Sequence, residues 1–175
     1  VAYHPVTLAA DSTAESLALF EALSGWQGPI VFCFPNADTG YQPLIERARN
    51  FCADRSQARL YTNLDHLSYW ALLHHACALV GNSSSGIMET ASIPLPTVDI
   101  GFLQQGRTRA TNVIHAAADK NAICTAIQHA MTPAFRSGLQ DCSNPYGDGH
   151  ASERIASVLA SAPDRTTLLH KRALP

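Results

Sequence analysis

The sequence has little charge and few lysines. Only 15% of its 175 residues are Asp, Glu, Lys or Arg, and its lysines are Lys120 and Lys171 alone. Twelve Lys and Arg against fourteen Asp and Glu give a formal charge of −2, and this balance implies no basic surface for a nucleic-acid backbone. We therefore expect no nucleic-acid partner.

Long apolar runs and paired cysteines are also missing. No apolar run approaches the roughly 20 residues that a membrane-spanning helix needs, and no charged stretch leads into an apolar one near the N-terminus. The five cysteines are odd in number and widely spaced, without a CxxC pair, which indicates neither a disulfide framework nor a zinc site. We expect no membrane association, no bound metal and a cytoplasmic location.

The chain does have enough apolar residues, 46%, to build one compact core. We expect a single domain over residues 1–162 and a tail over 163–175 without clear periodicity. Within the tail, residues 168–172 are compatible with a short helix. There is no initiator Met, and residues 1–3 have the pattern of a strand already under way. We therefore expect that the chain is part of a longer protein.

Short apolar runs alternate with helical patterns. The first helix is expected to begin at an N-cap at Asp11-Ser12 and to end before Gly25, with Leu17 and Leu19 on its apolar face. Further elements follow in turn, with strands expected at 29–34, 58–62, 77–81 and 96–100 and helices at 41–53, 66–75, 85–92, 119–131 and near 150–161. This alternation predicts an α/β fold with a parallel, doubly wound, Rossmann-like sheet, in which ligands bind at the carboxyl ends of the strands.

The densest chemical signal is the segment 81–89, GNSSSGIME, which follows a buried strand and opens a helix. Small residues, free N–H groups, serine hydroxyls and the positive end of a helix dipole favour a phosphate. Glu89 is placed to accept hydrogen bonds from the two hydroxyls of a ribose. A phosphate site beside a ribose site indicates a nucleotide. Spacing alone leaves open that Ser83 merely caps the helix and that Glu89 completes a capping arrangement.

Three further strand-end segments carry candidate ligand contacts. His4, in HPVT, can donate to a phosphate oxygen or shuttle a proton, or else be a strand-end residue that bonds a backbone carbonyl. Asn36, in PNADTG, can donate and accept toward a ligand, whereas we expect Asp38 to be a helix N-cap. Arg107, in QQGR, can clamp a phosphate or simply be solvated.

Two other features indicate structure more than chemistry. The segment 144–149, NPYGDG, combines turn residues before the last helix and is also consistent with a rigid loop. The pair His74-His75 is expected at a helix surface or end, because neither histidine has a companion metal ligand at a suitable spacing.

Taken in chain order, five motifs resemble the UDP-N-acetylglucosamine 2-epimerase family, specifically its hydrolysing, sialic-acid-pathway branch. They are HPVT, PNADTG, GNSSSGIMETASIPLPTVDIG, QQGR and NPYGDGHASERI, and they cover about residues 1–155. The resemblance implies the carboxyl-terminal half of a two-domain, glycosyltransferase-B-type architecture, with the substrate in the cleft between the halves. The family's acid and base carboxylates lie in the amino-terminal half, so Asp38, Glu89 and Asp148 are not expected to replace them.

The resemblance also assigns roles to residues. His4 would contact the diphosphate, as the catalytic residue of this half, and Asn36 would line the nucleotide cleft. Leu64 would contact uracil through its backbone.

In the segment 81–89, Ser83 and Ser84 would bind phosphate and Glu89 would hold the ribose hydroxyls. In QQGR, Arg107 would add a contact to the UDP portion. The non-hydrolysing epimerases typically carry a serine-diglycine phosphate loop and a TERPE-like segment where this chain has QQGR, which favours the hydrolysing branch. Pro94, His150 and the pair Phe102-Leu103 depart from the family's usual residues.

The implied reaction converts UDP-N-acetylglucosamine to N-acetylmannosamine and UDP without cofactor or metal. The implied partners are the UDP-sugar, the amino-terminal half of the same enzyme and further copies in a homo-oligomer. Two alternatives stay open, because one fold hosts several chemistries. They are the donor-nucleotide-binding half of a B-type glycosyltransferase and a non-catalytic UDP-binding module.

Overall fold

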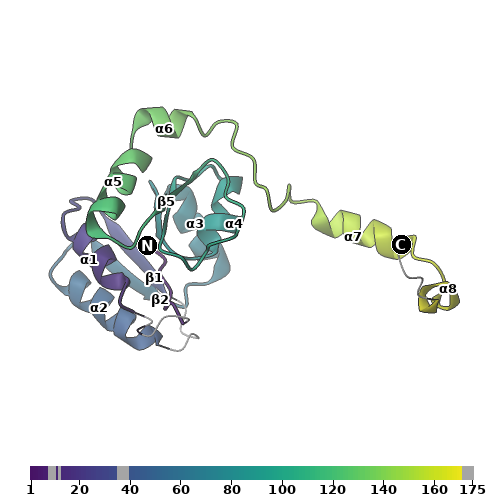
Figure 1. Ribbon diagram of the computed structural model, residues 1–175, viewed down its shortest axis with the longest axis horizontal. Helices are drawn as coiled ribbons and strands as arrows, with labels where there is room; N and C mark the ends of the chain where they lie inside the picture. Colours follow the sequence, from purple (N-terminus) through teal and green to yellow (C-terminus); the bar gives the residue numbers. More distant parts are fainter. Residues whose placement is uncertain (8–10, 12, 35–39, 171–175) are drawn as a thin grey trace. The chain divides into compact units, whose positions relative to one another are not determined.

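The computed structural model describes residues 1–7, 11, 13–34 and 40–170. The chain divides into two compact units, Val1–Pro145 and Tyr146–Pro175 (Figure 1). The first unit holds all of the strands and the helices α1 to α6, and the second holds α7 and α8. The domain boundary at residue 162 stays a prediction.

Parallel strands form the centre of the first unit. Strand β1 (Ile30–Phe34) pairs with β2 (Ala58–Thr62), while β4 (Thr97–Ile100) lies between β3 (Leu79–Gly81) and β5 (Val113–Ala116), and every ladder is parallel. All residues of β4 are buried, as expected for a parallel strand that is covered on both faces.

The N-terminal segment, Val1–Tyr3, joins the two groups of strands. On one side Ala2 N donates to Val80 O (3.0 Å), and on the other Cys33 N donates to Val1 O (2.9 Å). The order across the sheet is therefore β2, β1, N-terminal segment, β3, β4, β5. Numbered along the chain, this is the order 3-2-1-4-5-6 of a doubly wound Rossmann fold, which confirms the predicted fold class.

Helices cover both faces of the sheet (Figure 1). Helices α1 (Ser16–Ser24), α2 (Tyr41–Ala53) and α5 (Lys120–Ala130) pack into one core with the strands. Helix α3 (His66–His75) contributes to a second apolar cluster, and α4 (Ser85–Met88) lies beside α3 in Figure 1. The largest wholly buried apolar side chains include Tyr3, Leu19, Phe32, Leu44, Ile87, Val98, Ile100 and Ile123.

Aspartate caps fix where two of these helices begin. Asp65 Oδ1 accepts a hydrogen bond from Ser68 N (3.0 Å) ahead of α3, and hydrogen bonds from the Ser68 side chain and backbone lower the pKa of Asp65. Asp119 Oδ1 accepts from Asn121 N (2.9 Å) and Ala122 N (3.0 Å) ahead of α5. Such caps satisfy N–H groups that have no partner inside the helix.

The predicted start of the first helix is wrong. Helix α1 begins at Ser16, not after an N-cap at Asp11, and Ser12 lies outside the described residues. Asp11 Oδ1 instead accepts from Thr13 N (2.8 Å), so it stabilises a turn that precedes the helix. Leu17 is 52% exposed and is not on the buried face.

The predicted helix over 85–92 is interrupted. It divides into α4 and the 3₁₀ helix η1 (Thr90–Ser92). The Thr90 side chain donates to Gly86 O (2.8 Å), a side-chain bond to the preceding turn of the kind that bends or destabilises helices. Glu89 therefore lies at the junction of the two helices.

The long loop predicted after β4 contains the edge strand β5, and the short helix α6 (Pro133–Ser137) was not predicted. Strand β5 reads Val-Ile-His-Ala, and only Ala116 is buried in it. A run this short and this exposed lacks the continuous apolar pattern that marks the central strands.

The second unit holds helices α7 (Ala151–Ala160) and α8 (Arg165–Leu169), whose residues are all exposed. Helix α7 confirms the helix predicted near 150–161. Ahead of it, Asp148 Oδ1 accepts from Arg154 Nη2 (2.7 Å). The helices in the described part of the chain are too short or too polar to cross a membrane.

Candidate functional site

Polar residues meet where the strand order reverses. The N-terminal segment and β3 are neighbours in the sheet, and the chain leaves them in opposite directions around it. His4 follows the first and the serine loop, residues 82–85, follows the second, both at carboxyl ends. Crevices at this switch point are where doubly wound sheets bind ligands.

A side-chain amide ties the two strand ends together. His4 N donates to Asn82 Oδ1 (2.6 Å), and Asn82 Nδ2 donates back to His4 O (2.9 Å). Asn82 is fully buried, so water does not compete for these bonds. The backbone of His4 is thereby held against the serine loop. Sequence reasoning counted Asn82 only as a small loop residue and missed this role.

Several backbone N–H groups in and beside the serine loop are already bonded within the protein. Ser83 N donates to Ala2 O (3.3 Å), Gly86 N donates to Ser83 O (3.0 Å), and Ser85 N donates to Ser83 Oγ (3.3 Å). The predicted free N–H groups are therefore wrong at these positions. Ser83 is partly exposed and Ser84 is exposed, so their hydroxyls can donate to an anion.

Glu89 belongs to a chain of hydroxyl groups. Its Oε2 accepts from Ser85 Oγ (2.9 Å), and Ser85 Oγ in turn accepts from Tyr69 OH (3.0 Å) on α3. The alternative in which Glu89 completes a capping arrangement with Ser83 is therefore wrong. Sequence reasoning did not identify Tyr69 or the role of Ser85, because their pairing depends on how α3 packs beside α4.

Arg107 lies beside the end of α4. Its Nη1 contacts Met88 Sδ at 3.2 Å, and its side chain is exposed. The QQGR loop that carries it is held by Gln104, whose Nε2 donates to Asn82 O (2.7 Å) and whose side chain is buried. One residue, Asn82, therefore contacts both the His4 backbone and the loop of Arg107.

A cavity of about 390 Å³ opens among these groups. It brings His4, Leu64 and Ser83 together with Ser85 and Tyr69. Its complete lining in the described part of the chain is Ala2, His4, Cys33, Phe34, Asn63, Leu64, Tyr69, Ser83 and Ser85. Asn36 and Asp38 lie outside the described residues, so their predicted roles stay predictions.

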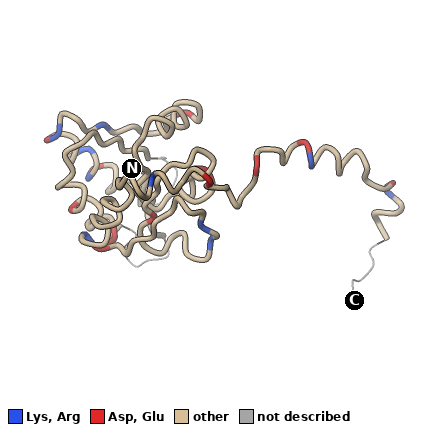
Figure 2. The backbone as a smooth tube through the Cα atoms, turned by 90° about the horizontal axis from the view of Figure 1, so that it is seen from above, with Lys and Arg blue, Asp and Glu red and all other residues tan. Residues whose placement is uncertain are grey.

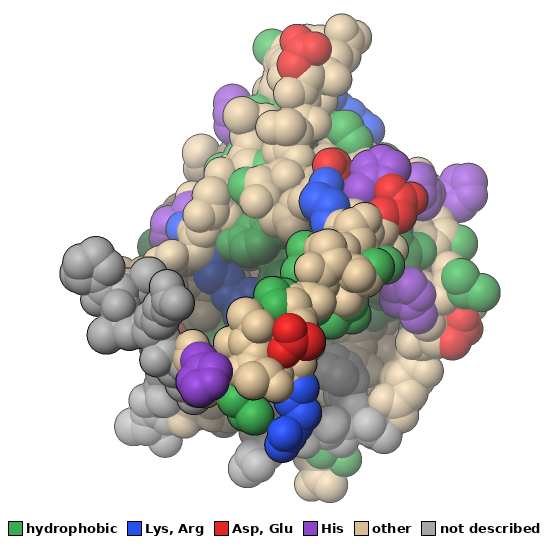
Figure 3. Space-filling model, turned by 90° about the vertical axis from the view of Figure 1, so that its right-hand side faces the viewer, with side chains coloured by type: hydrophobic (Ala, Val, Ile, Leu, Met, Phe, Trp, Pro, Cys, Tyr) green, Lys and Arg blue, Asp and Glu red, His purple; other side chains and the backbone are tan. Residues whose placement is uncertain are grey.

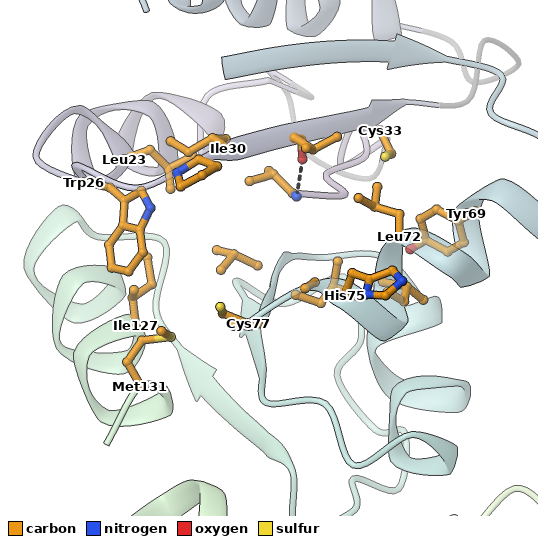
Figure 4. Close-up of a pocket in the computed structure, with 18 residues that line it drawn as sticks. Leu23, Trp26, Ile30, Cys33, Tyr69, Leu72, His75, Cys77, Ile127 and Met131 are labelled. Carbon is orange, nitrogen blue, oxygen red and sulfur yellow. Dashed lines mark hydrogen bonds between the residues drawn. The ribbon is translucent and has the colours of Figure 1, made fainter. Parts of the chain in front are cut away.

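A second cavity, of about 360 Å³, extends toward the amino-terminal ends of the strands and shares Cys33 and Tyr69 with the first (Figure 4). Its lining is mainly apolar, with Trp26 and Leu23 on one side, Ile127 from α5 and Leu72 from α3. We take the first cavity as the candidate site, because His4, Ser83 and Ser85 line it at the switch point of the sheet. Glu89 does not line this cavity but bonds Ser85, which does, and Ser84 and Arg107 do not line it either.

The described residues contain no cluster of three or more His, Cys, Asp or Glu side chains suited to a metal ion, and all five cysteines are free thiols. His74 and His75 end α3 and are exposed, as predicted. Acidic and basic residues are scattered along the backbone (Figure 2), and on the face drawn in Figure 3 the Lys and Arg side chains form separate spots rather than a continuous patch.

Asn144, in the NPYGDG segment, has a structural contact. Its Nδ2 donates to Met88 O (2.7 Å) and to Ser92 Oγ (2.8 Å). These bonds satisfy groups at the end of α4 and in η1. The first residue of this segment therefore supports the helices on which Glu89 lies.

Comparisons with known proteins identify the family of this chain. The family model for UDP-N-acetylglucosamine 2-epimerase matches residues 1–160. The chain is 35% identical over 149 residues to polysialic acid biosynthesis protein P7 of Escherichia coli, covering 83% of this chain and 38% of that protein. It is 32% identical over 171 residues to the hydrolysing UDP-N,N'-diacetylbacillosamine 2-epimerase of Legionella pneumophila, covering 97% of this chain and 44% of that protein.

Solved structures show the same fold. Staphylococcus aureus MnaA, solved with UDP, superposes with a TM-score of 0.73 at 16% identity, covering 99% of this chain and 46% of that one. The UDP-GlcNAc 2-epimerase of Methanocaldococcus jannaschii, solved with UDP-GlcNAc and UDP, gives a TM-score of 0.65 at 15% identity, covering 91% and 44%. The chain spans less than half the length of these relatives. By its sequence match and its fold, it belongs to the UDP-N-acetylglucosamine 2-epimerase family.

Proposed function

We propose that this chain is the UDP-binding half of a hydrolysing UDP-N-acetylglucosamine 2-epimerase, which converts UDP-N-acetylglucosamine to N-acetylmannosamine and UDP. The observation that carries the proposal is that His4, Ser83 and Ser85 line one cavity at the switch point of the sheet, with Glu89 bonded to Ser85 behind it. A relative that is named as hydrolysing and a similar fold solved with UDP support it.

Each polar group is assigned to one part of the nucleotide. The hydroxyls of Ser83 and Ser84 donate to the diphosphate, and the carboxylate of Glu89 accepts from the ribose hydroxyls. Leu64 lines the same cavity, and we assign its backbone to the uracil. We assign Asn36 to the nucleotide cleft, as the family resemblance implies. A carboxylate that accepts from hydroxyls forms charge-assisted hydrogen bonds, which are among the stronger ones.

Stabilising the leaving UDP is the contribution of this half to the reaction. When the C1–O bond of the sugar breaks, negative charge develops on the diphosphate. We assign the serine hydroxyls, the guanidinium of Arg107 and the imidazole of His4 to that charge. The backbone of His4 is held by Asn82, and the loop of Arg107 is held by Gln104. Donors that are already oriented do not need to reorganise during the reaction, which is why such electrostatic stabilisation is often large.

The remaining groups that the reaction needs belong to partners. We place the acid and base carboxylates that act on the sugar in an amino-terminal half of the same enzyme, and we expect the complete enzyme to be a homo-oligomer in the cytoplasm. The low and balanced charge gives no reason to add a nucleic-acid partner. This half alone is expected to bind UDP without turning over substrate.

Calorimetric titration of UDP into this chain tests the proposal. We expect saturable binding that GDP does not reproduce. Glu89→Ala is expected to weaken UDP binding by about 1–3 kcal/mol, the usual cost of losing hydrogen bonds to a charged group.

Glu153→Ala is the matched control, because Glu153 is an exposed carboxylate on α7, in the second unit. It is expected to leave UDP affinity unchanged. Equal binding of UDP and GDP, or equal affinity of the wild-type chain and Glu89→Ala, would contradict the nucleotide assignment.

A further inference from the structure

We propose that Tyr69 is a positioning residue for the ribose site, which it controls through Ser85 and Glu89. This inference rests on the proposed function and adds a residue outside the serine loop to it. The chain of contacts is continuous, with Tyr69 OH 3.0 Å from Ser85 Oγ and Ser85 Oγ 2.9 Å from Glu89 Oε2. It crosses from α3 to the junction between α4 and η1.

The structure fixes the position of Tyr69 itself. Its backbone N donates to Asp65 O (2.9 Å) in the first turn of α3, which the Asp65 cap anchors. Its ring is partly buried against the second apolar cluster, which contains Leu73 and Leu79. Figure 4 shows Tyr69 on α3 on the same side as Cys33. A hydroxyl on so constrained a ring has little freedom to leave its acceptor.

The direction of the hydrogen bonds follows from the chemistry. Glu89, as a carboxylate, only accepts, so Ser85 must use its single hydroxyl proton toward Glu89. The oxygen of Ser85 is then an acceptor for the Tyr69 phenol. Burial raises the pKa of Tyr69, so the phenol keeps its proton at neutral pH. Both hydroxyls therefore point their protons along the chain to Glu89 Oε2.

The bond from Ser85 leaves Glu89 free to accept from a ribose diol. Oε2 accepts the Ser85 proton, so Oε1 and the second lone pair of Oε2 are available to the two hydroxyls. The same bond restrains the Glu89 carboxylate before the ligand arrives. Preorganisation of this kind lowers the ordering cost of binding. The ligand class that gains from it carries a free 2′-hydroxyl, so the relay makes the site selective for a ribonucleotide over its 2′-deoxy form.

The test compares UDP with 2′-deoxy-UDP by calorimetry. For the wild-type chain we expect UDP to bind about tenfold more tightly, the factor that corresponds to one hydrogen bond to a charged group. Tyr69→Phe retains the ring and removes only the hydroxyl, and it is expected to reduce that ratio to about two- to threefold. Tyr61→Phe is the matched control, since Tyr61 lies exposed on β2, and it should retain the full ratio.

A second variant keeps the test decisive if one substitution disturbs folding. Ser85→Ala interrupts the relay at its centre and should reduce the ratio as Tyr69→Phe does, whereas in a Glu89→Gln background Tyr69→Phe should have no further effect on it. A ratio that stays at the wild-type value in Tyr69→Phe and Ser85→Ala, including one where both ligands weaken equally, overturns the positioning role. Failure of the wild-type chain to bind UDP at all would instead refute the proposed function, on which this inference rests.

Discussion

Removing the Asn82 side chain should uncouple His4 from the serine loop. Asn82→Ala deletes both hydrogen bonds to the His4 backbone, at 2.6 and 2.9 Å, from a site where Asn82 is fully buried. Leaving a buried donor or acceptor without its partner costs about 1–3 kcal/mol each. Because His4 is only partly buried, water can replace some of this loss. We therefore expect the free energy of unfolding to fall by about 2–4 kcal/mol.

Urea unfolding and UDP titration together test that reasoning. Asn82→Ala should lower the unfolding midpoint at an unchanged slope and should weaken UDP binding under conditions where the variant is folded. Asn112→Ala is the matched control, because Asn112 is also fully buried and donates to Thr90 Oγ1 (3.0 Å) and Leu95 O (2.8 Å), ahead of β5. It should lose similar stability and keep its UDP affinity. Equal UDP affinity in both variants would refute the positioning of His4 by Asn82.

Two further predictions concern the backbone at the switch point and the start of α7. Gly81→Ala places a methyl group against Ala2 O at a φ of +149°, so we expect the free energy of unfolding in urea to fall by about 3 kcal/mol or more. Gly106→Ala, at a φ of +84° in open space, should lower it by about 1 kcal/mol. Equal losses in the two variants would contradict this. A hydrogen bond from Arg154 lowers the pKa of Asp148 from 3.8 to about 2. Since the folded pKa is the lower one, the pair should support α7 fully above pH 3.8 and lose its effect as the pH falls toward about 2, and in a carboxyl NMR titration Arg154→Ala should return the pKa toward 3.8.

Most of the fold could be predicted from periodicity. Helices over 41–53 and 66–75 and the strand over 58–62 have the bounds that the sequence indicates. The residue types near the start of the first helix gave a wrong prediction, because the hydrogen bonds that form there differ from those of an N-cap. Aspartate is a common N-cap residue, but the side chain of Asp11 accepts from Thr13 N in a turn before the helix.

The strand-end residues of the site could be predicted from the sequence. The hydrogen bonds that hold these residues in place could not. His4, Ser83 and Glu89 follow strands or open a helix, and position alone marks them as candidates. The bonds of Asn82 to His4, of Gln104 to Asn82 and of Tyr69 to Ser85 join residues far apart in the sequence. No periodicity encodes such pairs, since they depend on which strands become neighbours.

The most direct test of the account is where UDP binds. Amide chemical shifts of the ¹⁵N-labelled chain should be followed during a UDP titration, with residues assigned at both edges of the sheet. Saturable shifts are expected at Ser83, Ser84, Glu89 and Arg107, and little change is expected at Ala78, which lines the apolar cavity but not the candidate site. Shifts centred on that cavity, or none that saturate, would contradict a nucleotide site built by the serine loop.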